Sequence, residues 1–475
     1  MSDLVLILAK CKQSNKAYSL FTFFYICFRK ISNLIKTTIL IYRLQTTILF
    51  FFLFMTNIQA QKVTKDIESL FQKDSYIDWY EHLHQNPELS TQEIATSDFL
   101  KNRVNAMGYT IIDSLGYYSF AAILHNGTGP TLLYRTDMDA LPIKEATGWA
   151  IASSKTSIKE NVATPIMHAC GHDIHMSTWL NVAKEMALSK NKWRGTLVLI
   201  AQSAEEIGKG AKAIFNSKNW NKVPKPNMQL AFHSNPNLEV GQLGFCEGYA
   251  MAAVDMMNIT IYGKGGHGAE PQKTIDPILL SAQFITEIQT IVSRNLSPND
   301  PAVITVGAIN GGTIGNVIPN EVVLKLTIRT YSAESRDLVL RRIKAIGDQL
   351  ALAAGMEATM LPKYDLLDMS IPSVFNSVSL GKSLKEHLGN SFSIVTVPPT
   401  MIGEDFGIYS KQNTISSYLI WLGVLSKTQL KNYEQDSLGI PSLHSPRFAP
   451  DYKNAIPKGT EAMVSSLLYL FKTKK

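Results

Sequence analysis

Three short apolar segments of this chain each run directly into acidic or histidine residues. The segments are residues 131–134, 195–201 and 228–232, and they lead into Asp137 and Asp139, into Glu205 and Glu206, and into His233, respectively. Short apolar runs bounded by turn residues are typical of buried strands. The carboxyl ends of strands in an open α/β sheet lie along one edge, where ligand sites form. We therefore expect these polar side chains to meet at one edge of a sheet.

Helical patterns alternate with these strands. Apolar residues recur at helical spacing in residues 64–83 and again in residues 173–189. Strands that alternate with helices predict a layered α/β domain with a mostly parallel sheet.

The pattern changes at about residue 252. An alternating strand over 253–262 precedes a helix over 276–294, strands over 302–310 and 321–331, a helix over 335–354 and a last strand near 357–361. This order predicts a small α+β sandwich inserted as a lid into the larger domain. We expect an N-terminal extension with signal peptide (1–60), a first catalytic-domain segment (61–250), the inserted domain (251–367) and a second catalytic-domain segment (368–475).

The net charge of +7 does not indicate a nucleic-acid-binding face. Seven of the 46 basic residues and one of the 39 acidic residues lie in residues 1–60. The remainder has 39 basic and 38 acidic residues, which is a net charge of only +1. No basic surface is implied for the folded part of the chain.

The pattern of residues 36–60 predicts an export signal. Lys36 and Arg43 precede an apolar run over 48–55, and the small-residue sequence Ile58-Gln59-Ala60 follows. This order is typical of a signal peptide, here cleaved after Ala60. The alternative is a membrane anchor, but eight apolar residues are fewer than the roughly 20 that a helix needs to cross a bilayer. We expect a periplasmic or extracellular protein with no stable membrane anchor after processing.

A further cluster, His168-Ala169-Cys170-Gly171-His172-Asp173, precedes the helix predicted over 173–189. Each of these residues, taken singly, has an ordinary structural explanation. An acidic residue after a strand usually forms a turn or caps a helix, and a lone histidine is more often a core residue than a ligand. Two other roles for Cys170 are a disulfide with Cys246 and membership, with His172, of a structural zinc site. A structural zinc site usually has paired Cys-x-x-Cys spacing, which is absent here. Thiol, imidazole and carboxylate groups at one sheet edge instead favour a site for zinc-like divalent metals.

Longer motifs add a resemblance to a known family. The motifs are Asp137-Met138-Asp139-Ala140-Leu141-Pro142-Ile143, Met167-His168-Ala169-Cys170-Gly171-His172-Asp173, Ala204-Glu205-Glu206, Gly263-Lys264-Gly265-Gly266-His267-Gly268-Ala269, Gly311-Gly312-Thr313 with Asn316-Val317-Ile318-Pro319, Gly403-Glu404-Asp405-Phe406 and Leu443-His444-Ser445-Pro446. Over roughly residues 75–470 the chain resembles the two-metal aminoacylase and carboxypeptidase family of metallopeptidases. More narrowly, it resembles the amidohydrolase branch, which includes N-acyl-L-amino acid amidohydrolases, hippurate hydrolases and hydrolases of auxin–amino acid conjugates.

The resemblance implies two divalent metal ions per chain, with zinc, manganese and cobalt left open. The implied ligands are Cys170, His172, Glu206, His233 and His444, with the Cys170 thiolate bridging the ions. Metal-bound thiols are deprotonated, which would leave Cys170 no free thiol for a disulfide.

The resemblance also implies roles for other residues. Glu205 is the expected general base, His267 the group that stabilises the oxyanion on lid closure, and Asn316 and Arg329 the groups that hold the substrate carboxylate. The alternatives are that His267 is a turn residue with no catalytic task and that Arg329 is a solvent-exposed charge on a strand.

Three departures from the family pattern are visible. Asp137-x-Asp139 stands where much of the family has His-x-Asp, and in the amidohydrolase branch these aspartates are expected to orient the ligands. Gln272 replaces a histidine, and the stretch from Glu145 to His168 is longer than in the branch.

The expected function is metal-dependent hydrolysis of small N-acyl amino acids, either hippurate-like or acetylated. The alternatives are an exopeptidase on the same scaffold and a non-catalytic binding protein. A homodimer formed through the inserted domain is left open.

Overall fold

The computed structural model describes residues 28–30, 76–413 and 415–472. The predicted signal peptide and the beginning of the helix predicted over 64–83 lie outside these residues. All of the labelled helices and strands belong to one compact unit, Asp74–Lys475. Among the described residues, no helix combines the length and apolar character needed to span a membrane.

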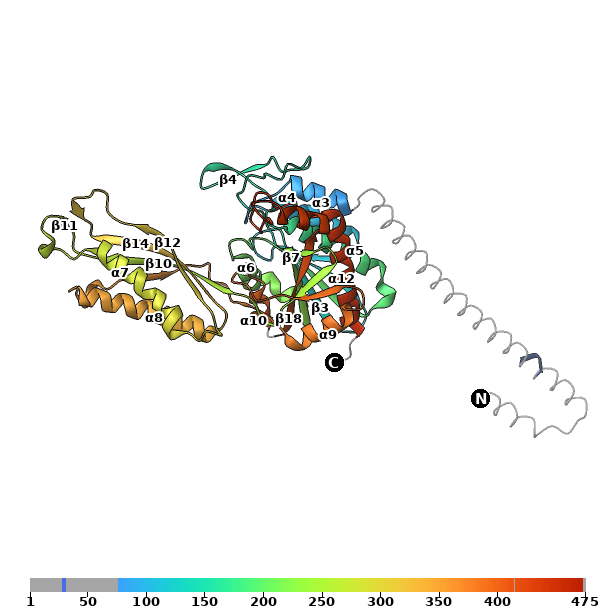
Figure 1. Ribbon diagram of the computed structural model, residues 1–475. Helices are drawn as coiled ribbons and strands as arrows, with labels where there is room; N and C mark the ends of the chain where they lie inside the picture. Colours follow the sequence, from blue (N-terminus) through green and yellow to red (C-terminus); the bar gives the residue numbers. More distant parts are fainter. Residues whose placement is uncertain (1–27, 31–75, 414, 473–475) are drawn as a thin grey trace, which may run out of the picture. The chain divides into compact units, whose positions relative to one another are not determined.

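An eight-stranded sheet forms the centre of the larger domain (Figure 1). Its four inner strands run parallel, in the order β6 (Gly195–Gln202), β3 (Thr131–Asp137), β7 (Met228–Glu239) and β18 (Ser416–Leu425). The outer strands are β1 (Thr110–Ile112), β2 (Phe120–Asn126), β8 (Gln242–Phe245) and β17 (Ser393–Thr396). The predicted mostly parallel α/β sheet is therefore confirmed.

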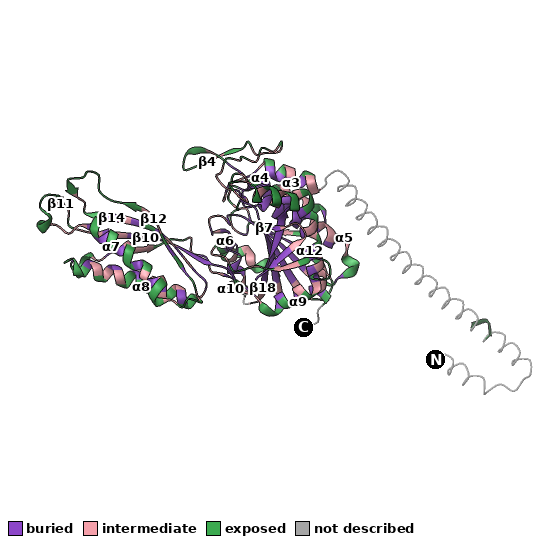
Figure 2. Ribbon diagram, in the orientation of Figure 1, coloured by how far each residue is buried: buried purple, intermediate pink, exposed green. Residues whose placement is uncertain are grey.

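Helices cover both faces of this sheet, as adjacent residues of β2 show. Phe120 packs edge-on against Trp179 of α5 (His172–Leu188), with ring centroids 6.0 Å apart. Ala121 belongs to a buried apolar cluster that contains Ile214 of α6 (Gly210–Asn216) and Tyr409 of α10 (Gly407–Asn413). Successive strand residues point to opposite faces, so α5 and α6 lie on opposite sides. The inner strands are correspondingly buried along their length (Figure 2).

Three further helices pack against α5 on the same face of the sheet. They are α3 (Tyr76–Gln85), α4 (Ile94–Ala106) and α12 (Tyr452–Lys472). Helix α9 (Val378–Leu388) packs against α12 and β18.

A second, antiparallel sheet lies in the range where the inserted domain was predicted. Its strands are β10 (Ala253–Tyr262), β12 (Val303–Asn310), β14 (Glu321–Thr330) and β15 (Lys363–Leu366), in the order β12-β14-β10-β15. Helices α7 (Pro277–Thr290) and α8 (Ala333–Ala353) pack on it side by side (Figure 1). Phe284, Leu324 and Ile343 join a core that belongs to this domain alone. The expected α+β lid is confirmed.

Two strand predictions were wrong. The last lid strand is not at 357–361, where Ala358–Met360 forms a 3-10 turn. It is β15, an edge strand in which polar and apolar residues alternate over only four positions, so that its pattern is easily missed. Strand β7 does not end before His233 but continues to Glu239, because β18 keeps pairing with its polar second half.

Candidate metal centre

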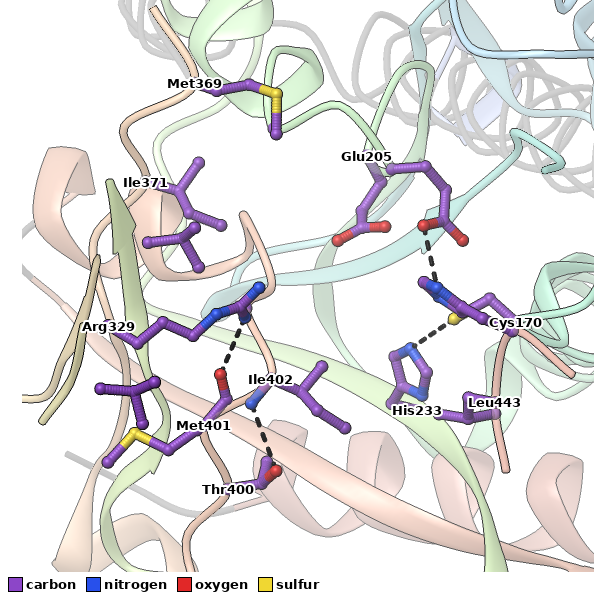
Figure 3. A pocket seen from close by; sticks show the side chains of 16 residues that line it. Cys170, Glu205, His233, Arg329, Met369, Ile371, Thr400, Met401, Ile402 and Leu443 are labelled. Atoms are coloured by element: carbon purple, nitrogen blue, oxygen red, sulfur yellow. Dashed lines mark hydrogen bonds and ion pairs between the residues drawn. The ribbon is translucent and has the colours of Figure 1, made fainter. Parts of the chain in front are cut away.

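All five predicted metal ligands meet at the carboxyl-terminal edge of the large sheet. Cys170, His172 and His233 bring their ligand atoms within 4.8 Å of one another, and so do Cys170, Glu206 and His444. Cys170 therefore belongs to both of these groups, and His172, Glu205 and Glu206 form a further group of the same kind. Figure 3 shows the Cys170 thiol beside the ring of His233, whose Nε2 lies 3.5 Å from the sulfur.

The backbone around these ligands is held in unusual conformations. Gly171 begins α5 with a φ of 83°, and a Cβ at this position would lie 3.0 Å from the Ser234 hydroxyl. Ala204 and His444, which are not glycines, also adopt positive φ values of 57° and 66°. Such strained residues cluster at functional sites, where surrounding contacts hold them.

Asp139 organises both His172 and the glutamate pair. The His172 ring donates from Nδ1 to the backbone carbonyl of Asp139 at 2.7 Å, because a carbonyl only accepts. The Asp139 carboxylate accepts the backbone N–H groups of Glu205 and Glu206 at 3.2 and 3.0 Å. Asp139 thus fixes the ring orientation of one ligand and the turn that carries another, as expected for an orienting residue.

Two ligand atoms are left without partners by this arrangement. His172 Nε2 and Glu206 Oε1 are buried and have no hydrogen-bond partner within the described part of the chain. Buried polar atoms are rarely left unpaired. These two atoms lie 3.8 Å apart, and a bound cation that displaces the proton of His172 Nε2 could be held by both.

Asp137 adjoins the cluster: its carboxylate lies 3.8 Å from His172 Nε2, and Asp137, His172 and His175 form another group that could hold a metal ion. The same carboxylate contacts His175 Nδ1 at 2.7 Å and accepts a hydrogen bond from Arg135 at 2.8 Å. The other ring nitrogen of His175 lies 3.0 Å from the hydroxyl of Ser234. Asp137 therefore connects the cluster to a second layer of buried polar groups.

Arg135 is the centre of that second layer, and its role was missed in the sequence. Its guanidinium binds Glu404 at 2.9 and 3.2 Å and Asp405 at 2.9 Å, besides Asp137. Glu404 and Asp405 also lie close to Glu205, since one oxygen of each is within 4.8 Å of the others. The Gly-Glu-Asp-Phe motif was noted in the sequence, but nothing there paired it with Arg135.

A second buried network, likewise missed, adjoins the ligand helix. His84 of α3 contacts Asp173 at 2.7 Å and Glu145 at 3.2 Å. Burial lowers the pKa of His84, but the hydrogen bonds to these two carboxylates outweigh it and raise the pKa to about 9. The pKa values of both carboxyls are lowered, which agrees with an ionised triad.

The ligand cluster carries an excess of buried acidic groups. Burial and the neighbouring glutamates raise the pKa of the Cys170 thiol, and burial with Glu404 and Glu206 raises that of Glu205. Burial raises the pKa of Glu206 to about 8. Burial alone would lower the pKa of His172, but Asp137, Asp139 and Glu206 raise it to about 10. Divalent cations would supply the positive charge that this donor set lacks.

A cavity of about 570 Å³ opens onto the cluster, and we call it the catalytic cavity. Cys170, Glu205, Glu206, His233 and His444 line it, together with Arg329 from the lid strand β14. The half-buried Arg329 donates to the carbonyl of Met401 at 2.8 Å and has no carboxylate within ion-pair distance among the described residues. In Figure 3 its guanidinium faces the ligands across the cavity.

His267 and Asn316 are brought together, but away from the ligands. They flank a two-stranded ribbon, β11 (Gly266–His267) and β13 (Val317–Ile318), in which Gly268 donates to the Asn316 carbonyl at 2.9 Å. Both side chains are exposed, and neither lines the catalytic cavity. Their expected roles stay predictions.

The remaining sequence features also lie outside the catalytic cavity. Gln272 is exposed in a 3-10 turn. The long 145–168 stretch forms a hairpin of β4 (Thr156–Lys159) and β5 (Val162–Pro165), and none of its residues lines the cavity. Cys170 and Cys246 are both free thiols, so no disulfide joins them.

Buried ligand groups, an adjacent carboxylate and an accessible cavity at a parallel-sheet edge define a metal-dependent hydrolase. Residues 133–467 match the sequence profile of peptidase family M20/M25/M40, and the chain belongs to this family. The resemblance inferred from the motifs is thereby confirmed, as is its assignment as an enzyme that hydrolyses amide carbon–nitrogen bonds.

Individual relatives cover most of the described chain. An N-acetyl-L-cysteine deacetylase of Bacillus subtilis is 36% identical over 69% of this chain and 76% of its own length. An N-acetyldiaminopimelate deacetylase of Oenococcus oeni is 32% identical over 82% of this chain and 96% of its own length. The solved YXEP protein of Bacillus subtilis, described as a dinuclear metal-binding peptidase of the M20 family, has a TM-score of 0.69 and 27% identity, covering 84% of this chain and 98% of that one.

Proposed function

We propose that this chain hydrolyses the amide bond of N-acyl amino acids with two divalent ions and Glu205 as general base. The observation that carries the proposal is the sharing of Cys170 between two ligand groups, with Glu205 beside them and Arg329 across the same cavity. Similarity to deacetylases of N-acetylcysteine and N-acetyldiaminopimelate supports the substrate class. The soft thiol, imidazole and carboxylate set suits zinc, cobalt or manganese.

The metal ions would lower the pKa of a water molecule and polarise the scissile carbonyl. Glu205 has a different task. Its carboxylate lines the cavity and shares a candidate group with His172 and Glu206, but it is a member of neither group that contains Cys170. It accepts the proton of the attacking water and then delivers a proton to the nitrogen of the leaving amino acid, so that water adds across the amide bond.

Arg329 provides the recognition of the substrate's free carboxylate. Its guanidinium is half-buried and donates one N–H group to the Met401 carbonyl. The remaining N–H groups are free for a ligand, and the guanidinium faces the cavity in Figure 3. A guanidinium with no protein counter-ion is suited to bidentate binding of a carboxylate. Closure of the lid would be needed to add His267 and Asn316.

The experiment is a substrate panel with protein freed of metal and reloaded with Zn²⁺, Mn²⁺ or Co²⁺. N-acetyl and N-benzoyl amino acids, the same compounds with the carboxylate converted to an amide, and dipeptides are compared, and bound metal is quantified. We expect about two ions per chain and hydrolysis of acyl amino acids with a free carboxylate. Hydrolysis of dipeptides alone would instead identify an exopeptidase.

The matched variant is Arg329→Met. It should lower kcat/KM for the carboxylate substrates by about 100-fold or more while changing kcat/KM for their amide analogues little, because only the former lose a charge-assisted pair. An equal loss with both kinds of substrate would contradict the role of Arg329.

A further inference from the structure

A cavity of about 540 Å³, which we call the loop cavity, is separate from the catalytic cavity. Part of its wall is the loop that follows Glu145, with Trp149, Ala150 and Ile151. The other lining residues come from α3, from the start of α11 (Lys427–Glu434) and from the chain that enters α12. No described residue lines both cavities, and none of the predicted metal ligands lines the loop cavity.

The loop is fastened to buried groups of the protein. Its first residue, Glu145, accepts a hydrogen bond from the backbone N–H of Ser153 at 2.6 Å and contacts the buried His84 at 3.2 Å. The ring of Trp149 also packs against the ring of His84, with centroids 5.5 Å apart. The loop cavity therefore has a wall that is formed before any ligand arrives, as is usual for small-molecule sites.

Two aromatic rings give this wall an apolar part. Tyr452 stacks on the buried Tyr80, with ring centroids 4.2 Å apart and an interplanar angle of 13°. The ring of Trp149 is tilted against that of Tyr452, with centroids 5.7 Å apart. Both lining rings are only partly buried, so each keeps surface that a flat apolar group can cover.

Charged side chains of both signs line the same cavity. Glu81 and Asp451 are acidic, and Lys453 is basic. None of the three has an oppositely charged side chain within ion-pair distance in the described part of the chain. Glu81 accepts a hydrogen bond from the Tyr452 hydroxyl at 2.9 Å, and Asp451 accepts from the side-chain amide of Asn454, so both carboxylates have only neutral partners. Carboxylates and an ammonium group that do not pair with each other are available to a ligand that carries both charges.

A free amino acid with an aromatic side chain has the matching chemistry. Its ammonium group suits the carboxylates of Glu81 and Asp451, its carboxylate suits Lys453, and its ring suits Trp149 and Tyr452. The cavity volume lies within the roughly 300–1,000 Å³ that is common for small-molecule sites. An N-acyl amino acid matches less well, because acylation removes the positive charge of the nitrogen.

We propose that the loop cavity binds a free aromatic amino acid, such as L-phenylalanine, at a site distinct from the metal centre. The proposal goes beyond the proposed hydrolysis and does not depend on it, since it rests on the charges and rings of the loop cavity. A protein with both properties would hold, in this second site, the kind of product that hydrolysis releases and not its substrate.

The test is calorimetric titration of L-phenylalanine into metal-loaded Arg329→Met, a variant in which the catalytic cavity lacks its proposed carboxylate-binding group. We expect one bound L-phenylalanine per chain. 2-Phenylethylamine lacks the carboxylate and 3-phenylpropanoate lacks the ammonium group, so each should bind at least about tenfold more weakly. Metal-free protein should bind L-phenylalanine equally well, because no predicted metal ligand lines the loop cavity.

A matched pair of variants in the same background locates the binding. Lys453→Met should weaken L-phenylalanine binding at least about tenfold, and the exposure of Lys453 leaves the core unaffected by the change. Lys382→Met, at an exposed lysine of α9 that lines neither cavity, should keep the affinity of its parent.

Three results would overturn the proposal: no binding of L-phenylalanine, equal binding of all three compounds, or binding that Lys453→Met leaves unchanged. Binding that disappears with the metal would also overturn it, because the ligand would then lie at the metal centre. If metal-loaded wild type cleaves no N-acyl amino acid, the proposed function fails while this proposal stands.

Discussion

Arg135 binds the carboxylate of Glu404 through both terminal guanidinium nitrogens, at 2.9 and 3.2 Å, although 269 positions separate the two residues. Both side chains are almost completely buried. The pair joins β3, which precedes the lid insertion, to the chain that follows it. It therefore ties together the two segments of the catalytic domain directly beneath Glu205.

Replacing this arginine should destabilise the protein strongly. Arg135→Met leaves Asp137, Glu404 and Asp405 buried without their shared cation, and removing one member of a buried ion pair costs about 3–5 kcal/mol. Denaturant unfolding of metal-free protein measures the change. Arg341→Met, at an exposed arginine of α8, is the matched control and should change stability by less than about 0.5 kcal/mol. Similar stabilities of the two variants would show that the buried network contributes nothing.

Glu205 and Glu206 should fail in different ways although they are adjacent. Glu205→Gln keeps its size but removes the proton acceptor, so kcat should fall about 10²–10⁴-fold or more while bound metal is retained. Glu206→Gln should lower metal occupancy, because a neutral amide is a poor replacement for a carboxylate ligand. Metal analysis and steady-state kinetics on both variants check this. The opposite pattern would exchange the two roles, and full activity with full metal in both would refute the proposed site.

Cys170→Ser should weaken metal binding more than folding. A serine hydroxyl stays protonated where a metal-bound thiol ionises, so both ligand groups lose a negative charge. Metal titration and thermal unfolding without metal separate the effects, and Cys246→Ser, at the other buried cysteine, serves as the control. Unchanged stoichiometry in Cys170→Ser would exclude the thiol as a ligand.

His84 should make stability depend on pH above neutrality. Its pKa is raised from 6.5 to about 9 in the folded state, so its contribution is fully present below about pH 6.5 and is lost as pH rises through about 9. The difference in unfolding free energy between wild type and His84→Gln should therefore shrink between pH 6.5 and 9.5. Denaturant titrations across that range measure it. A difference that grows with pH would mean that His84 is neutral in the folded protein.

The export signal predicted over residues 36–60 is open to a direct test. The order of basic, apolar and small residues predicts a mature N-terminus at Gln61. N-terminal sequencing of protein isolated from its native source would identify it. An active intracellular enzyme that retains residues 1–60 would contradict export.

Much of the large domain was predictable because its inner strands are apolar throughout. Residues 195–201 predicted β6 to within one residue, since a strand buried on both faces carries an uninterrupted apolar run. Residue type indicated a metal site, because thiol, imidazole and carboxylate groups at one sheet edge suit divalent metals, whereas the five ligand candidates followed from the resemblance to a known family. The edge strand β15 escaped prediction, because its alternation of polar and apolar residues covers only four positions, the shortest run that indicates a strand.

The supporting network was not predictable, for a different reason. A buried arginine is permitted only by its partners, and two of the three carboxylates that bind Arg135, those of Glu404 and Asp405, come from a segment about 270 residues further along the chain. The place of His267 relative to the ligands was equally beyond reach, because it depends on the position of a lid domain with its own core. Sequence pattern reports what each element buries locally, whereas these two features depend on how distant elements meet.

The order of the ligands along the chain has a consequence for synthesis. Cys170, His172, Glu206 and His233 all precede the lid, whereas His444 follows it. A polypeptide still on the ribosome has every member of one ligand group but lacks a member of the other until residue 444 has emerged. Chains cut short anywhere before that point, including those that end after a complete lid, are therefore unable to assemble the shared site. Products that lack residue 444 through premature termination or proteolysis should consequently be inert.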